Sequence, residues 1–152
     1  MVQHAFLFSP GQWLGEGKIV LSMVDEELSF VTKWTIMPPD AEGKIECVQE
    51  IQIKGLADVM HNQFSIFDLS SNLFQIELEN QSLGRVGGKG LIDDKVIAWE
   101  FRLSEVGFEG FELYEKQKDD TYNIRAEYAS NDDFRTLIQG KLWKQAVTDQ
   151  KS

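Results

Sequence analysis

Few residues in this sequence could carry nucleophilic, acid–base or metal chemistry. The chain has one cysteine, Cys47, and two histidines, His4 and His61. These three share no spacing typical of metal ligands. Cys47 lies among alternating apolar residues, which favours a small core residue over a nucleophile. His61 would have to be the base of any Ser-His-Asp triad, but a lone histidine near a loop is usually at the surface. We expect His4 to be exposed as well.

Acidic pairs and one glycine-rich stretch are the remaining candidates for chemistry. Asp93-Asp94, Asp119-Asp120 and Asp132-Asp133 fall in turns between apolar segments, where carboxylates are usually solvated. Gly87-Gly88-Lys89-Gly90 has neither the spacing of a phosphate-binding loop nor a following helix. The sequence therefore predicts no catalytic residues, no metal site and no cofactor.

The elements that would position any site read as strands. About ten segments alternate apolar and polar residues or are bounded by turn residues, and none keeps a helical apolar period. Between the third and fourth segments, residues 56–60 are expected to form a short helical or irregular piece. The predicted strands span residues 12–23, 27–37, 44–54, 62–69, 73–79, 83–92, 95–103, 108–116, 122–129 and 134–144.

Composition bounds the class of protein. A chain of 152 residues with 42% hydrophobic residues suits one domain with a buried core. We expect that domain to span residues 1–152, with 1–10 as an N-terminal cap and 145–152 as a polar tail. A net charge of −10 makes nucleic acid and anionic membranes poor partners. One cysteine, no signal-peptide pattern and no apolar run of membrane length predict a cytoplasmic protein.

Ten sequential strands with short connections favour a closed sheet. Open edges invite aggregation, and the twist of a large sheet curls it round. A two-sheet sandwich would need long crossovers, which this chain lacks. The sequence therefore predicts an all-β fold, a single closed up-and-down antiparallel barrel of about ten strands.

The start of the first strand carries a resemblance. Gly11-Gln12-Trp13 looks like the Gly-x-Trp of the calycin group, which includes lipocalins and fatty-acid-binding proteins. The longer Gly-x-Trp-x-Gly-x-Gly pattern, which ends at Gly17, is most similar to the start of nitrobindin-type barrels. The resemblance implies a lipocalin-like barrel in which a basic residue of the last strand covers Trp13. Lys141 is the nearest candidate for that closure, and Lys144 is another.

The chain also departs from these families. It has no room for the helix pair that fatty-acid-binding proteins place after strand one, and it has no disulfide-forming cysteine pair. Nitrobindins bind haem through a histidine near the C-terminus, whereas this chain has no histidine after His61. The Arg-x-Tyr carboxylate clamp is also not reproduced, because Arg125 and Tyr128 are three residues apart and point to opposite faces of a strand.

The apolar parity of each strand should face the barrel interior. Its polar members are Thr32, Gln49, Tyr114, Tyr122, Tyr128 and Thr136, without Lys or Arg and without a pair of carboxylates. An unpaired buried ion would cost several kcal/mol, so the interior suits a neutral, largely apolar ligand. The predicted ligand-lining residues are Trp34, Gln49, Trp99, Phe101, Tyr114, Tyr128 and Thr136.

Two functions of different kinds are consistent with this pattern. In the first, a non-catalytic cytoplasmic barrel binds a small neutral apolar molecule. In the second, large aromatics fill the interior, and the barrel binds a protein through outward residues such as Val31, Val48 and Trp143. An enzyme working at the barrel mouth is supported only by fold analogy. The volume and lining of the interior distinguish the first two.

Overall fold

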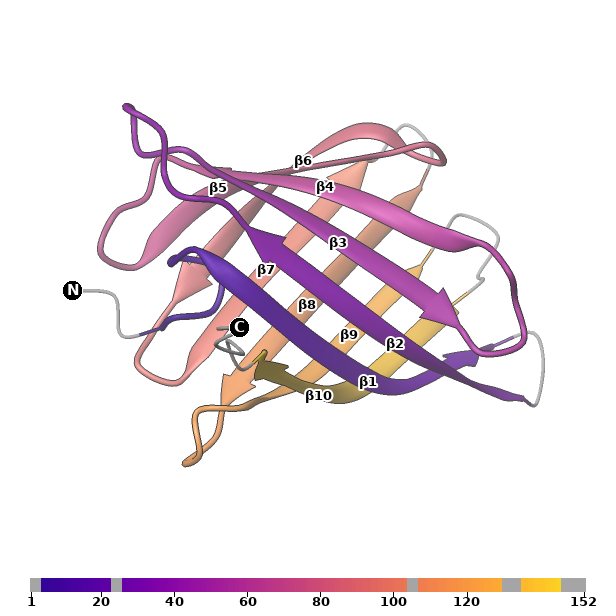
Figure 1. The fold of residues 1–152 in the computed structure, drawn as a ribbon. Coiled ribbons are helices and arrows are strands. Elements are labelled where there is room, and N and C mark those ends of the chain that lie inside the picture. Colours follow the sequence, from indigo (N-terminus) through magenta and orange to yellow (C-terminus); the bar gives the residue numbers. More distant parts are fainter. Residues whose placement is uncertain (1–3, 23–25, 104–106, 130–134, 146–152) are drawn as a thin grey trace.

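A computed structural model describes residues 4–22, 26–103, 107–129 and 135–145 of the chain. The acidic pair Asp132-Asp133, the outer ends of the first and last predicted strands at Met23 and Phe134, and most of the predicted tail lie outside these residues. Figure 1 shows ten strands wrapped into one barrel. The strands are β1 (Gly11–Leu21), β2 (Glu27–Ile36), β3 (Ile45–Ile53), β4 (Val59–Phe67), β5 (Leu73–Asn80), β6 (Gly84–Ile92), β7 (Val96–Leu103), β8 (Phe108–Lys116), β9 (Tyr122–Ala129) and β10 (Arg135–Lys144).

Every strand pairs antiparallel with its neighbours in the chain, and β1 pairs with β10 to close the sheet. The predicted all-β closed barrel is therefore confirmed. Gly17 lies opposite Gly140 where the first and last strands meet. A Cβ atom added to Gly17 would lie 2.1 Å from the Gln139 carbonyl oxygen. The two glycines thus allow a close backbone approach at the closure of the barrel.

The strand β4 differs most from its predicted bounds. It begins at Val59, because Val59 and Met60 pair with Gln52 and Ile51 of β3, where an irregular or helical piece was expected. It ends at Phe67, and Asp68 follows with a left-handed φ of 52° that turns the chain. Among the described residues there is no helix, and so none that could cross a membrane.

The glycine-rich strand β6 makes room for aromatic side chains of its neighbours. A Cβ at Gly90 would lie 2.0 Å from the Phe74 ring of β5, and one at Gly88 would lie 2.7 Å from the Phe101 ring of β7. Both rings are buried inside the barrel. Gly88 and Gly90 of β6 therefore serve core packing.

The segment before β1 enters one end of the barrel, as seen beside the N-terminus in Figure 1. Phe6 and Leu7 have no exposed surface. The expectation that His4 is exposed is wrong, because its side chain is 3% exposed. Its Nε2–H donates to the Asp93 carbonyl at 2.7 Å, so Nδ1 accepts from the Tyr122 hydroxyl at 2.6 Å. These bonds anchor the segment against the barrel rim.

Candidate functional site

The interior of the barrel has two unlike halves. The plugged half surrounds Phe6, and its inward side chains are large and fully buried. The far half lies toward the opposite strand ends, and there inward residues such as Tyr128, Ile138 and Asn62 are only half-buried. Apart from His4 and Tyr122 at the plugged end, the polar side chains of the interior gather in the far half and at the boundary between the halves.

Aromatic rings fill the plugged half. The Phe6 ring lies 5.3 Å from Trp34 and 5.0 Å from Tyr114, measured between ring centroids. Trp34 stacks on Phe64 at 5.0 Å, and Trp99 stacks on Tyr114 at 5.0 Å. Such contacts add to the stabilisation from apolar burial, so this half is a packed core.

A buried carboxyl group marks the boundary between the halves. Glu112 of β8 is 8% exposed and faces inward. The Tyr114 hydroxyl donates to its Oε1 at 2.6 Å, and the Tyr128 hydroxyl donates to its Oε2. We call these three residues the Glu112 cluster. The predicted set of inward polar residues wrongly omits Glu112, although a single carboxyl is not the pair whose absence was expected.

The parity of β8 explains the error. Its apolar residues occupy both faces, and Phe111, which is 38% exposed, points outward. Phe108, Gly110, Glu112 and Tyr114 share the inward parity. Tyr114 is drawn into the aromatic core, and a period of two then places Glu112 inside as well.

Gly110 allows the Glu112 cluster to form. Gly110 lies opposite Tyr128 of β9 in the ladder, and a Cβ added to it would lie 2.1 Å from the Tyr128 ring. The ring thus lies across Gly110 and stacks on Phe108 at 5.8 Å. From that position its hydroxyl reaches Glu112.

Burial decides the charge of the Glu112 cluster. Loss of solvation raises the pKa of the Glu112 carboxyl, and the two tyrosine hydrogen bonds offset only part of that rise. Burial also raises the pKa of Tyr114 and of Tyr128 well above the ordinary tyrosine value. Burial thus opposes the charged form of each group in the Glu112 cluster.

A chain of amides lines the opposite wall. The Gln49 side-chain NH₂ donates to the Thr32 hydroxyl at 3.3 Å, and the Asn62 NH₂ donates to Gln49 Oε1 at 3.0 Å. The Asn80 NH₂ donates to Asn62 Oδ1 at 2.9 Å, while Asn80 Oδ1 accepts from the backbone N–H of Leu83. This amide chain joins β2 to β5 inside the barrel without any charged group.

Two interior donors have no partner. The indole Nε1–H groups of Trp34 and Trp99 are buried, and neither has a hydrogen-bond acceptor in the described part of the protein. Trp34 pairs with Gln49 across β2 and β3, and Trp99 pairs with Glu112 across β7 and β8. The tryptophans thus adjoin both polar groups of the interior.

The structure places all the predicted ligand-lining residues on inward positions. Trp34, Trp99, Phe101 and Tyr114 are fully buried, Gln49 is 7% exposed, and Tyr128 and Thr136 are half-buried. Gln49 and Tyr128 enter the polar groups described above, and Thr136 lies opposite Tyr128 in the ladder. Their role as ligand contacts stays a prediction.

At the predicted closure, Trp13 is buried and lies opposite Lys144 in the ladder. Lys141 instead lies opposite Glu16 and is exposed. The Lys144 side chain also passes beside Gly11, at 3.5 Å from the position of an added Cβ. The register thus brings Lys144, the second candidate, nearest to Trp13.

Sequence reasoning missed Glu112, Asn62 and Asn80 as interior groups. The parity of Tyr114 was the one signal for Glu112, because a residue two positions away on a strand shares its face. The fourth predicted strand had no clear parity, so Asn62 carried no signal. Asn80 was taken for a turn residue, although β5 extends to it.

The other sequence candidates have structural surroundings that explain them. Cys47 is buried in the core, and burial raises the pKa of its thiol to about 12, which disfavours the reactive thiolate. Asp93 and Asp119 accept backbone N–H bonds within their own turns. Among the described residues, no group of three His, Cys, Asp or Glu side chains could hold a metal ion.

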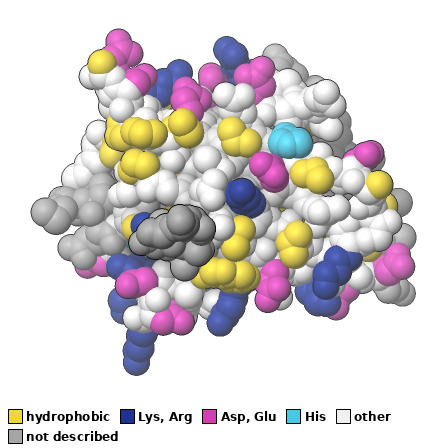
Figure 2. Space-filling model, viewed as in Figure 1, with side chains coloured by type: hydrophobic (Ala, Val, Ile, Leu, Met, Phe, Trp, Pro, Cys, Tyr) yellow, Lys and Arg dark blue, Asp and Glu magenta, His cyan; other side chains and the backbone are white. Residues whose placement is uncertain are grey.

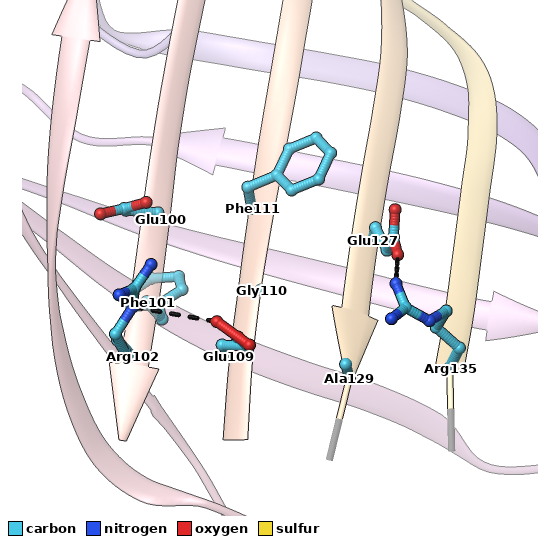
Figure 3. Close-up of a pocket in the computed structure, with 9 residues that line it drawn as sticks. All are labelled: Glu100, Phe101, Arg102, Glu109, Gly110, Phe111, Glu127, Ala129 and Arg135. Carbon is cyan, nitrogen blue, oxygen red and sulfur yellow. Dashed lines mark hydrogen bonds and ion pairs between the residues drawn. The ribbon is translucent and has the colours of Figure 1, made fainter. Parts of the chain in front are cut away.

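The outer wall also has hollows. One lies over β7 to β10, where Arg102 pairs with Glu109 and Arg135 with Glu127 on either side of Phe111 (Figure 3). These charged groups are mostly exposed, and such pairs contribute little free energy. A second hollow of about 270 Å³ has Leu14, Val31, Val59 and Trp143 in its lining.

The sequence matches no family model, and a search of the curated proteins also finds no match. Among solved structures, the chain is similar to the S-type phycobiliprotein lyase CPES from Guillardia theta, with a TM-score of 0.67 and 8% sequence identity. The likeness covers 92% of this chain and 90% of the lyase chain. At this identity it concerns the fold alone. The closed barrel and this neighbour are consistent with a calycin-like fold.

Proposed function

We propose that this protein is a non-catalytic barrel that binds a small neutral molecule in the far half of its interior. The observation that carries the proposal is the Glu112 cluster, a buried polar group that, with the amide chain, interrupts a mostly apolar interior. Binding sites for small molecules are mostly apolar with a few placed polar groups. The similarity to a phycobiliprotein lyase supports small-molecule handling as the use of this barrel.

A neutral ligand follows from the charges that the interior holds. Among the described residues, no Lys or Arg is buried, and burial favours the uncharged form of Glu112. An anionic ligand would have to give up its hydration without a buried cationic partner, and a cationic ligand would need Glu112 in the ionised form that burial disfavours. An apolar molecule with few polar atoms meets no such penalty.

A pair of tryptophan substitutions on β10 tests the location of the site. Ile138 faces inward between Ile19 and Ala126, whereas Leu137 faces outward and is 42% exposed. We expect wild-type protein to bind the neutral dye Nile red with a rise in fluorescence. Ile138→Trp should weaken this binding about tenfold or more by filling the interior, while Leu137→Trp should leave it unchanged.

The result has a clear opposite. Equal binding of Nile red to the two folded variants would place the dye on the outer surface and contradict the interior site. Failure of wild-type protein to bind Nile red or any member of a broad neutral panel would overturn the proposed function itself. Circular dichroism and unfolding midpoints establish that each variant is folded.

A second candidate function is protein binding through the outer wall. The hollow lined by Leu14, Val31, Val59 and Trp143 favours it, since Val31 and Val59 are about 40% exposed (43% and 40%). Figure 2 shows, however, that apolar side chains on the described part of the face carrying β1 to β4 form separate groups among polar atoms. Stable interfaces are usually built on a continuous apolar centre, so the interior site is the better supported proposal.

A further inference from the structure

Two hydrogen-bond donors in the middle of the barrel have no acceptor in the described part of the protein. The indole N–H groups of Trp34 and Trp99 are both buried and unpartnered. Their ring centroids are 6.2 Å apart, and the rings meet edge to face at 71°. Nearly all buried N–H groups in proteins have an acceptor, because leaving one unpaired is costly. Two neighbouring exceptions therefore indicate a missing acceptor.

The Glu112 cluster lies beside these donors, because Trp99 is the ladder partner of Glu112. Its two hydrogen bonds, from the Tyr114 and Tyr128 hydroxyls, each use one oxygen of the Glu112 carboxyl. In the described part of the protein, neither of these oxygens accepts from an indole N–H group.

The amide chain leaves its side-chain acceptors engaged. Gln49 Oε1 accepts from Asn62, Asn62 Oδ1 accepts from Asn80, and the Thr32 hydroxyl oxygen accepts from Gln49. These acceptors bind one another, while the two indole donors at the middle of the barrel remain without partners.

The two indole donors lie near one another in the fold. Trp99 is the ladder partner of Glu112 and stacks on Tyr114 at 5.0 Å. Trp34 lies 6.4 Å from Tyr114 between ring centroids. The rings of Trp34, Trp99 and Tyr114, from β2, β7 and β8, therefore lie together in the interior.

We propose that the ligand of this barrel carries an uncharged oxygen acceptor, a carbonyl group on an apolar skeleton, which binds the indole N–H groups of Trp34 and Trp99. This inference rests on the proposed function. A carboxylate ligand is disfavoured, because no Lys or Arg among the described residues is buried to neutralise it. A ligand that only donates hydrogen bonds would leave both indole N–H groups without an acceptor.

A matched pair of probes tests the acceptor. Fluorenone and fluorene have the same tricyclic skeleton and differ in a carbonyl that replaces a methylene group. We expect wild-type protein to bind fluorenone about tenfold more tightly than fluorene, as one net hydrogen bond would provide. In proton–nitrogen correlation spectra, fluorenone should move the indole N–H signal of Trp34 or Trp99 downfield. The indole signal of Trp143, on the outer face of β10, serves as the control.

Two variants identify the donors. Trp34→Phe and Trp99→Phe each remove one N–H and keep an aromatic ring. The preference for fluorenone over fluorene should fall toward unity in at least one of them. Because the preference is a ratio measured on one protein, a general loss of stability does not imitate it. The missing indole signal in each spectrum also assigns the resonance.

The inference and the proposed function fail in different ways. If Nile red binds in the interior but fluorenone shows no preference over fluorene, including the case in which neither binds, the acceptor inference is overturned and the interior site stands. Indole signals that are already downfield and do not respond to fluorenone would assign the donors to buried water, which also overturns it. Failure of every neutral probe overturns both.

Discussion

The plugged half and the far half of this barrel are enclosed by the same ten strands, but their interior side chains differ in packing and polarity. In the plugged half, Phe6 contacts the rings of Trp13, Trp34, Tyr114 and Tyr122, and apolar burial accounts for nearly all the contacts. In the far half, several inward side chains, among them Asn62, Tyr128 and Ile138, are only half-buried. The contrast indicates that the plugged half stabilises the fold. The far half contains buried polar side chains, which stabilise the fold less than apolar residues would.

The largest expected effect breaks the plugged half. Phe6→Ala should destabilise the protein by about 3–5 kcal/mol, because it empties the centre of the aromatic cluster. Phe111→Ala on the outer face of β8 is the matched control and should cost about 1 kcal/mol or less. Denaturant unfolding followed by tryptophan fluorescence measures both. Equal midpoints for the two variants would show that the N-terminal segment is not part of the core.

A smaller effect tests the wall of the far half where the barrel closes. A Cβ at Gly140 would lie 2.3 Å from the Glu16 carbonyl oxygen, so Gly140→Ala should cost about 1–3 kcal/mol through backbone displacement. Gly87 on β6 has no atom within 4 Å of an added Cβ. Gly87→Ala should therefore be neutral or stabilise by up to about 1 kcal/mol. The melting temperatures of the two variants test this prediction. If Gly140→Ala were as stable as wild-type protein, the close approach of β1 and β10 would be contradicted.

The smallest effect concerns the protonation of the Glu112 carboxyl at the boundary between the halves. Burial raises the pKa of Glu112 in the folded protein above its unfolded value, so the folded state keeps a proton that the unfolded state loses. The stability of wild-type protein relative to Glu112→Gln should therefore fall as the pH rises above about 4.3 and level off above the folded pKa. The slope within this window is about 1.4 kcal/mol per pH unit.

Unfolding measured across this pH range, with Glu100→Gln on the exposed outer face of β7 as the control for removing one carboxylate, checks the sign. A stability difference between wild type and Glu112→Gln that does not change with pH would contradict the buried neutral carboxyl. A difference that rises with pH would show that the tyrosine hydrogen bonds outweigh burial and hold the carboxyl ionised.

Much of the barrel could be predicted because the strands alternate clearly. Thr32, Trp34 and Ile36 share one parity on β2, and all three are buried. Phe74, Ile76 and Leu78 do the same on β5. The burial of such residues can be predicted from their alternation alone, since the inward face of a barrel strand must be mostly apolar. Prediction failed where the local pattern was mixed, as on β8, or where no strand was expected, as at Val59 and Met60.

The candidate site was harder to predict than the fold. Glu112 is buried because its strand neighbour Tyr114 packs in the core and because Tyr128 reaches it across Gly110, and these contacts join residues on two strands. His4 is buried because its partners Asp93 and Tyr122 come from distant parts of the chain. Nothing in the immediate sequence of either residue reveals such partners.

By itself the sequence determined that the chain forms one antiparallel barrel with an apolar inner face, because periodicity and short turns are local properties. Only the tertiary structure decided which half of the interior is packed, which carboxyl is buried and which indole groups lack acceptors. Those outcomes depend on how rings from different strands share a finite volume. Which buried groups find hydrogen-bond partners is decided only when all the strands are assembled.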